Sequence, residues 1–174
     1  MAATIDPYQW VIEAVDEHEL PLLRYARRLL AGDLDLARDA VQHAFVKLCE
    51  ESRERLEGRI APWLYRVCRN RALDHLRRDG RERALLDGEA VDGGNAPQPS
   101  TVSREADPAI AVEHRELAVR LRELLAEVPA PQREAIDLWC AGLTNREIAE
   151  VTGRTEVHVR VLVHRGLKIG RAHV

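Results

Sequence analysis

The stretch from residue 84 to residue 112 constrains the fold of this chain more than any other part of the sequence. It contains two adjacent glycines, three prolines and many small polar residues, with little apolar periodicity. Five acidic residues oppose Arg104 alone, so the segment carries a net charge of about −4. A stretch of this composition cannot bury enough apolar surface to fold by itself. We therefore predict a flexible acidic linker between two separate domains, residues 1–83 and residues 113–174.

In both flanking segments the apolar residues have the spacing typical of amphipathic helices. Apolar residues recur at intervals of three and four, and only 4% of the residues are aromatic. The segment 6–33 predicts two short helices broken near Pro21, and the segment 33–52 predicts a third. Pro62 suits the first turn of a fourth helix. The predicted fold is all-α, with an N-terminal four-helix bundle and a C-terminal helix-turn-helix domain.

The charges are distributed unevenly. The net charge is −3, yet residues 53–83 hold ten Arg against five acidic residues, and residues 154–174 hold five Lys or Arg against one Glu. Two basic patches in an otherwise acidic chain indicate contact with nucleic acid at two points.

The first patch lies on the predicted helix that contains "WLYRVCRNRALDHLRR". At 100° per residue, its apolar side chains fall on one half, and Arg66, Arg69, Asn70 and Arg77 fall together on the other. Two interpretations stand at this point: the solvated side of an amphipathic helix, or a basic face that binds a polyanion.

The second patch follows a local helix-turn-helix pattern. Thr144 and Glu147 form a capping box, Gly153 suits the tight turn, and Thr155 can cap the next helix. The outward face of that helix carries six residues: Val157, Arg160, Val161, His164, Arg165 and Lys168. A generic helical hairpin would share the buried face, but this mixture of donors and small apolar groups favours the major groove of duplex DNA.

Other classes of site are not indicated. Cys49, Cys68 and Cys140 form no CxxC pair, which predicts three reduced thiols in or near the core. The sequence shows no metal-ligand spacing, phosphate loop or nucleophile–base pair, so we expect no enzyme, metal or cofactor. It also shows no signal sequence and no apolar run of about 18 residues, so we expect a cytoplasmic protein without membrane insertion.

Two motifs in order resemble one family, the extracytoplasmic-function (ECF) group of the sigma-70 family. "DLDLARDAVQHAFVKL" is similar to its D-A-E-D-x-V-Q-x-x-F run, and "APWLYRVCRNRALDHLRR" to its W-L-x-x-I-x-x-N-x-x-x-D-x-x-R-R run. The C-terminal similarity covers "LRELLAEVPAPQREAIDLWCAGLTNREIAEVTG" and "VHRGLK", whereas the recognition helix reads "VHVRVLV" in place of G-T-V-K-S-R-L.

The resemblance implies an RNA polymerase sigma factor that binds core RNA polymerase and promotes promoter melting. The minus-10 element would bind as separated strands to Arg66, Arg69, Asn70 and Arg77. The loop 51–61 would form a pocket for one base. Trp63 would be either a core anchor or a stacking partner for DNA. The minus-35 duplex would meet Arg160, Val161, His164, Arg165 and Lys168.

The same resemblance implies protein partners. The third predicted helix would contact core polymerase through its free polar side, at Asp39, Gln42 and Lys47, the linker would enter the polymerase cleft, and an anti-sigma factor would restrain the protein. The alternative function is a stand-alone helix-turn-helix transcriptional regulator, whose N-terminal bundle dimerises or senses a signal.

Overall fold

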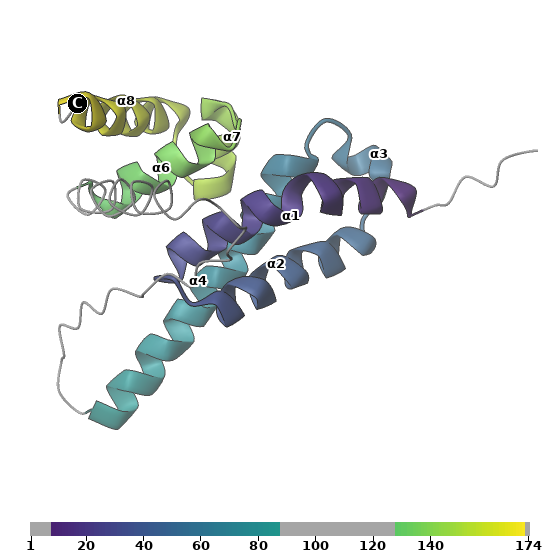
Figure 1. Ribbon diagram of the computed structural model, residues 1–174, viewed down its shortest axis with the longest axis horizontal. Coiled ribbons are helices and arrows are strands. Elements are labelled where there is room, and N and C mark those ends of the chain that lie inside the picture. The colour runs from purple at the N-terminus through teal and green to yellow at the C-terminus, as the bar shows by residue number, and fades with distance from the viewer. Residues whose placement is uncertain (1–7, 88–127, 173–174) are drawn as a thin grey trace, which may run out of the picture. The chain divides into compact units, whose positions relative to one another are not determined.

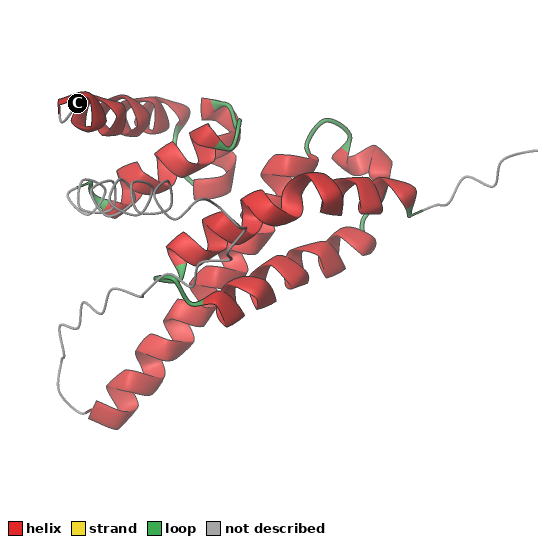
Figure 2. Ribbon diagram, in the orientation of Figure 1, coloured by secondary structure: helices red, strands yellow, loops and turns green. Residues whose placement is uncertain are grey.

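The computed structural model describes residues 8–87 and 128–172. Within these residues every secondary-structure element is a helix (Figure 2). They divide into two compact units, one mainly N-terminal and one mainly C-terminal. The predicted all-α class with two helical domains is confirmed.

The N-terminal unit contains three long helices and a short one. These are α1 (Gln9–Leu29), α2 (Leu34–Cys49), α3 (Arg53–Leu56) and α4 (Ile60–Asp87). Helix α2 packs against both α1 and α4, and α1 also contacts α4 (Figure 1). The core between them holds the rings of Tyr25 and Tyr65 edge to face, with centroids 5.2 Å apart. Aromatic rings prefer this geometry because the positive edge of one meets the negative face of the other.

Local sequence explains where α2 begins. Ala31 and Gly32, just after the end of α1, both adopt positive φ. This backbone conformation turns the chain away from the axis of α1. Asp33 then accepts hydrogen bonds from the backbone N–H groups of Asp35 and Leu36, each at 3.0 Å. This cap satisfies two donors that the first turn of a helix otherwise leaves unpaired.

The predicted break at Pro21 is wrong, because α1 runs without interruption from Gln9 to Leu29. Proline removes one backbone hydrogen bond from a helix interior. However, Val11 and Ala14 before it and Leu22 and Tyr25 after it are buried on one continuous stripe. Packing of that stripe against α2 and α4 holds the helix together. The described part of this unit, residues 8–87, therefore has four helices, but one of the four is the short α3 and not a second half of α1.

The predicted start of the linker also needs correction. Helix α4 continues to Asp87, so residues 84–87, assigned to the linker, are helical. The rest of the predicted linker, residues 88–112, and the helix expected over residues 113–127 lie outside the described residues.

The C-terminal unit contains α6 (Ala130–Cys140), α7 (Asn145–Thr152) and α8 (Glu156–Ala172). Helix α6 packs closely against α8. Gly166 is buried at this contact, where a Cβ would overlap Cδ1 of Ile136 and lie 3.0 Å from its Cγ1. The missing side chain of Gly166 thus permits the close approach of the two helices.

The predicted place of the cysteines in or near the core is correct for one residue of three. All three thiols are free, but only Cys68 is buried, while Cys49 and Cys140 are exposed. Burial raises the pKa of the Cys68 thiol to about 12, so this side chain stays protonated and acts as a small apolar core residue.

Candidate nucleic-acid interface

The caps and the glycine turn predicted for the helix-turn-helix are present in the structure. Thr144 Oγ1 accepts a hydrogen bond from the Glu147 N–H, and the Glu147 carboxylate accepts from the Thr144 N–H at 2.7 Å, which is a complete capping box. Gly153 has φ +68° at the end of α7. Thr155 Oγ1 then accepts from the His158 N–H at 3.3 Å and caps α8. The helix-turn-helix geometry therefore follows from residues within the motif itself.

Helix α8 separates its two faces as its sequence predicts. Val159, Leu162 and Val163 are buried. The six residues predicted to face outwards are all exposed, namely Val157, Arg160, Val161, His164, Arg165 and Lys168. Arg160 lies 3.2 Å from Glu156 one turn earlier, an ion pair in which both side chains are largely exposed. Because solvent screens such a pair, the Arg160 guanidinium can exchange this partner for a base or a phosphate at little cost.

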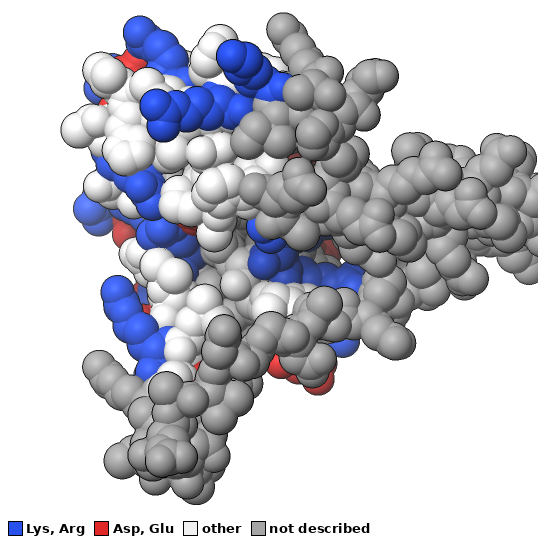
Figure 3. Space-filling model, turned by 90° about the vertical axis from the view of Figure 1, so that its left-hand side faces the viewer, with Lys and Arg blue, Asp and Glu red and all other residues white. Residues whose placement is uncertain are grey.

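A second basic surface lies on α4. Arg66, Asn70 and Arg77 are exposed, whereas Arg69 is half-buried. Arg77 donates to Asp74 at 3.2 Å, again between exposed side chains. Figure 3 shows Lys and Arg side chains more prominently than Asp and Glu side chains on the described surface of this view. The predicted minus-10 residues thus share one helix, with Arg69 set deeper than the others.

Trp63 and the loop before α4 lie at the start of this surface. Trp63 is half-buried, next to the fully buried Leu64 and the buried Pro62. Such a position supports the core through one part of the indole and leaves another part accessible. The predicted loop 51–61 contains α3, whose Leu56 is buried and anchors the segment.

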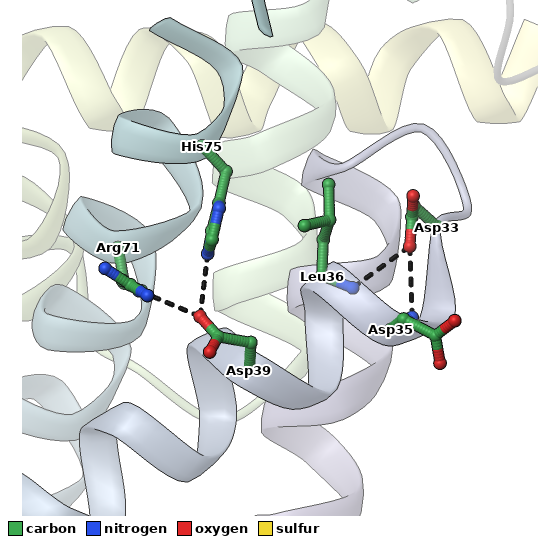
Figure 4. Close-up of polar contacts among 6 residues, drawn as sticks. All are labelled: Asp33, Asp35, Leu36, Asp39, Arg71 and His75. Carbon is green, nitrogen blue, oxygen red and sulfur yellow. Dashed lines mark hydrogen bonds and ion pairs between the residues drawn. The ribbon is translucent and has the colours of Figure 1, made fainter. Parts of the chain in front are cut away.

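The predicted polymerase-binding residues on α2 are not equally available. Asp39 was expected on a free polar side, but Arg71 Nε donates to its carboxylate at 2.8 Å and His75 Nε2 lies 2.7 Å from the same oxygen (Figure 4). The Arg71 hydrogen bond, and next the His75 one, hold the pKa of Asp39 below its usual value. Helix α4 therefore supplies two partners for Asp39, although 46% of the Asp39 side chain stays exposed.

Sequence reasoning missed Arg71 and His75 as partners of this carboxylate. On a helical wheel Arg71 falls at the margin of the apolar side of its helix, and its hydrogen bond to Asp39 shows that this margin faces α2. Their i, i+4 spacing was the available signal, since it puts two basic side chains on one stripe.

Gln42 and Lys47 remain exposed on α2. Lys47 donates to Glu50 at 2.7 Å, within its own helix end. Gln42 lines a groove between α1 and α2 with six other residues: Val15, Glu19, Leu23, Arg38, Val41 and Phe45. The groove is mainly apolar, so Gln42 lies at the edge of a surface suited to a protein partner.

Two further observations concern the described residues alone. No group of His, Cys, Asp or Glu side chains in residues 8–87 and 128–172 gathers closely enough to hold a metal ion. In the same residues, no helix combines the length and apolar character that crossing a bilayer requires.

Comparison with known proteins connects both basic helices to one family. The model of sigma-70 region 2 matches residues 14–82, which include α2 and most of α4, and the model of sigma-70 region 4 matches residues 118–169, which include α7 and most of α8. The chain belongs to the sigma-70 family. The resemblance noted from the sequence motifs is therefore confirmed.

One similar protein is the "ECF RNA polymerase sigma factor SigE" of Mycolicibacterium smegmatis. The two are 30% identical over 155 residues, which cover 88% of this chain and 57% of the relative. The chain thus spans less than two thirds of that relative's length. Within the sigma-70 framework, the α4 surface belongs to region 2 and the α8 surface to region 4.

Proposed function

We propose that this chain is an ECF-type sigma factor that binds core RNA polymerase, recognises a promoter at two points and promotes its melting. The observation that carries the proposal is the presence of both family regions in one chain, each with a basic helix surface. A promoter contacted at two separate elements requires two such surfaces in one protein.

The minus-35 element would be read as duplex DNA by α8. Its exposed face carries Arg160, Val161, His164, Arg165 and Lys168. The second helix of a helix-turn-helix enters the major groove, where arginine can donate to guanine and lysine can contact phosphate.

The minus-10 element would be held as separated strands along α4. Arg66, Arg69, Asn70 and Arg77 supply a basic track for the backbone, and the accessible part of Trp63 supplies an aromatic surface. Extrusion of a base costs a few kcal/mol. Exposed arginines alone provide too little energy for this, so the polymerase must contribute to melting.

Core polymerase would contact α2 at Gln42 and Lys47 and along the groove between α1 and α2. Asp39 would act indirectly, by holding α2 against α4 through Arg71 and His75. This arrangement explains why a conspicuous carboxylate on α2 need not touch the polymerase.

An anti-sigma factor would restrain the chain by covering one of these surfaces. The proposed function also requires the protein to work in the cytoplasm, where promoter DNA and polymerase are found. It assigns no catalytic step to the chain itself, because the polymerase forms the phosphodiester bonds.

The test is reconstitution of the full chain with core polymerase. We expect co-purification with the core enzyme and run-off transcription from a cognate promoter that neither component supports alone. A matched variant with Ala at Arg160, Arg165 and Lys168 should still co-purify but should lose promoter-dependent transcription. A chain that binds a specific duplex without core enzyme, and never co-purifies with it, would instead be a stand-alone regulator.

A further inference from the structure

Two valines lie exposed on the outward face of α8. Val157 is 69% exposed and Val161 is 41% exposed. They are four residues apart, so they lie on the same side of the helix, one turn after the other. Single exposed apolar residues are common on protein surfaces. Here, however, two of them form a continuous strip among Arg160, His164 and Arg165, on a face that is otherwise polar.

The fold of the C-terminal unit does not need these two side chains. Its core receives Val159, Leu162 and Val163 from the opposite side of α8. Val157 is the second residue of α8, and Val161 occupies the next turn. The N-terminal residues of a recognition helix are those that meet base edges. The valine strip therefore lies where a helix-turn-helix reads its sequence.

The chemistry of the major groove limits what such a strip can recognise. Among the four base pairs, thymine alone presents an apolar group there, the C5-methyl. Contact with valine removes this methyl from water and is worth roughly a fourfold gain in affinity for each methyl buried. The cationic neighbours hold the helix to the phosphates, and the valines add preference for particular bases.

We infer that Val157 and Val161 determine promoter specificity by contacting the C5-methyl groups of two thymines in the minus-35 duplex. This inference rests on the proposed role of α8 as the duplex-reading helix. Four residues advance a helix by about 6 Å, and adjacent base pairs are about 3.4 Å apart. The two thymines should therefore lie within one or two base-pair steps of each other.

Replacement of thymine by uracil tests the inference, because it removes the methyl and leaves base pairing intact. Holoenzyme reconstituted from the full chain and core polymerase first selects its preferred minus-35 sequence from a randomised duplex library. Each thymine of the selected duplex is then replaced by uracil, and the affinity of the holoenzyme is measured. We expect roughly fourfold losses at two thymines one or two steps apart.

The valine variants assign each thymine. Val157→Ala should diminish the effect of uracil at one position and Val161→Ala at the other, while each variant keeps the helicity of the parent protein. Ile12→Ala is the matched control, since Ile12 is an exposed apolar residue on α1; it should retain both effects. Undiminished uracil effects in the valine variants would overturn the inference.

Two other outcomes separate this inference from the proposed function. A selected duplex whose thymines all tolerate uracil overturns the inference alone. A chain that forms no holoenzyme, or that selects no duplex, overturns the proposed function and this inference with it.

Discussion

Asp39 joins two helices through one carboxylate oxygen. Arg71 and His75 both contact this oxygen from α4, and their hydrogen bonds lower the pKa of Asp39. A carboxylate with a lowered pKa in the folded state stabilises the fold fully above its unfolded pKa of about 3.9. This stabilisation is lost as the pH falls through the lower pKa of the folded state.

Asp39→Asn should therefore destabilise the N-terminal unit at neutral pH, and the difference from the parent should shrink as the pH falls below about 4. Urea unfolding at several pH values measures this, followed by the fluorescence of Trp10 and Trp63 in a Trp139→Phe background. Asp16→Asn, at an exposed site on α1, is the control. A difference that stays constant down to pH 2 would show that the ionised form of Asp39 does not stabilise the fold.

Arg160 directly precedes Val161 in the sequence and is exposed, like both valines of α8. Arg160→Ala should weaken minus-35 binding by the holoenzyme, by ~1 to 3 kcal/mol if the guanidinium contacts a base. Binding to a panel of single-base variants of the promoter distinguishes the contacts. Relaxed preference at one position indicates a base, and a uniform loss indicates a phosphate. Arg24→Ala on α1 should change neither, and unchanged binding by Arg160→Ala would show that another face reads the DNA.

At the scale of elements, the contact between α6 and α8 depends on Gly166. Gly166→Ala places a methyl against Ile136, and overpacking of this kind costs ~1 to 3 kcal/mol. Alanine gains up to about 1 kcal/mol of helix propensity in return. We expect a net loss of roughly 1 kcal/mol in the free energy of unfolding of the C-terminal unit.

Ile136→Val supplies the matched background for this prediction, because it removes the Cδ1 atom that the new methyl would meet. In this background Gly166→Ala should be neutral or stabilising. The double-mutant cycle is measured by denaturant unfolding. Equal losses in both backgrounds would show that the contact with Ile136 does not limit the approach of the helices.

Substitution of Gln42 tests the proposal that core polymerase contacts α2. Since its side chain is exposed at the edge of the groove between α1 and α2, Gln42→Ala should weaken core binding and leave helicity and thermal stability nearly unchanged. The measurement is a titration of labelled chain with core polymerase. Gln9→Ala, at the start of α1, is the control. Unaltered assembly would exclude Gln42 from the contact, whereas loss of folding would assign it a structural role.

At the scale of the whole molecule, the segment between the two units poses a separate question. Residues 88–112 carry Glu89, Asp92, Glu105 and Asp107 against Arg104 alone. A neutral Gly/Ser segment of equal length reaches about 30 Å as a flexible coil but carries no charge. If the segment only tethers the units, initiation should be normal. If it occupies a basic channel of the polymerase, early RNA synthesis should fall.

We expect the defect, modest in promoter binding and larger in early RNA synthesis, because an acidic strand complements a channel built for nucleic acid. Promoter affinity and abortive-transcript yield measure the two effects. A segment with the same residues in scrambled order keeps the charge and should restore initiation. If the Gly/Ser version has the promoter affinity and the abortive-transcript yield of the parent, the segment acts only as a spacer.

The features that could be predicted from the sequence are local ones. The helix-turn-helix follows from Thr144, Glu147, Gly153 and Thr155, whose hydrogen bonds and backbone angles span only a few residues. The two faces of α8 follow from helical periodicity for the same reason. The family could also be recognised, since its motifs are short runs that can be matched without knowing which helices touch.

The contacts between helices could not be predicted from local sequence. Pro21 breaks a helix by local rules, but α1 continues because α2 and α4 bury the stripe on both sides of it. Asp39 looked free on α2, yet its partners Arg71 and His75 are more than 30 positions away along the chain. Periodicity reports which side of a helix is polar. It does not report which neighbouring helix faces that side, because packing between helices brings together residues far apart in the chain.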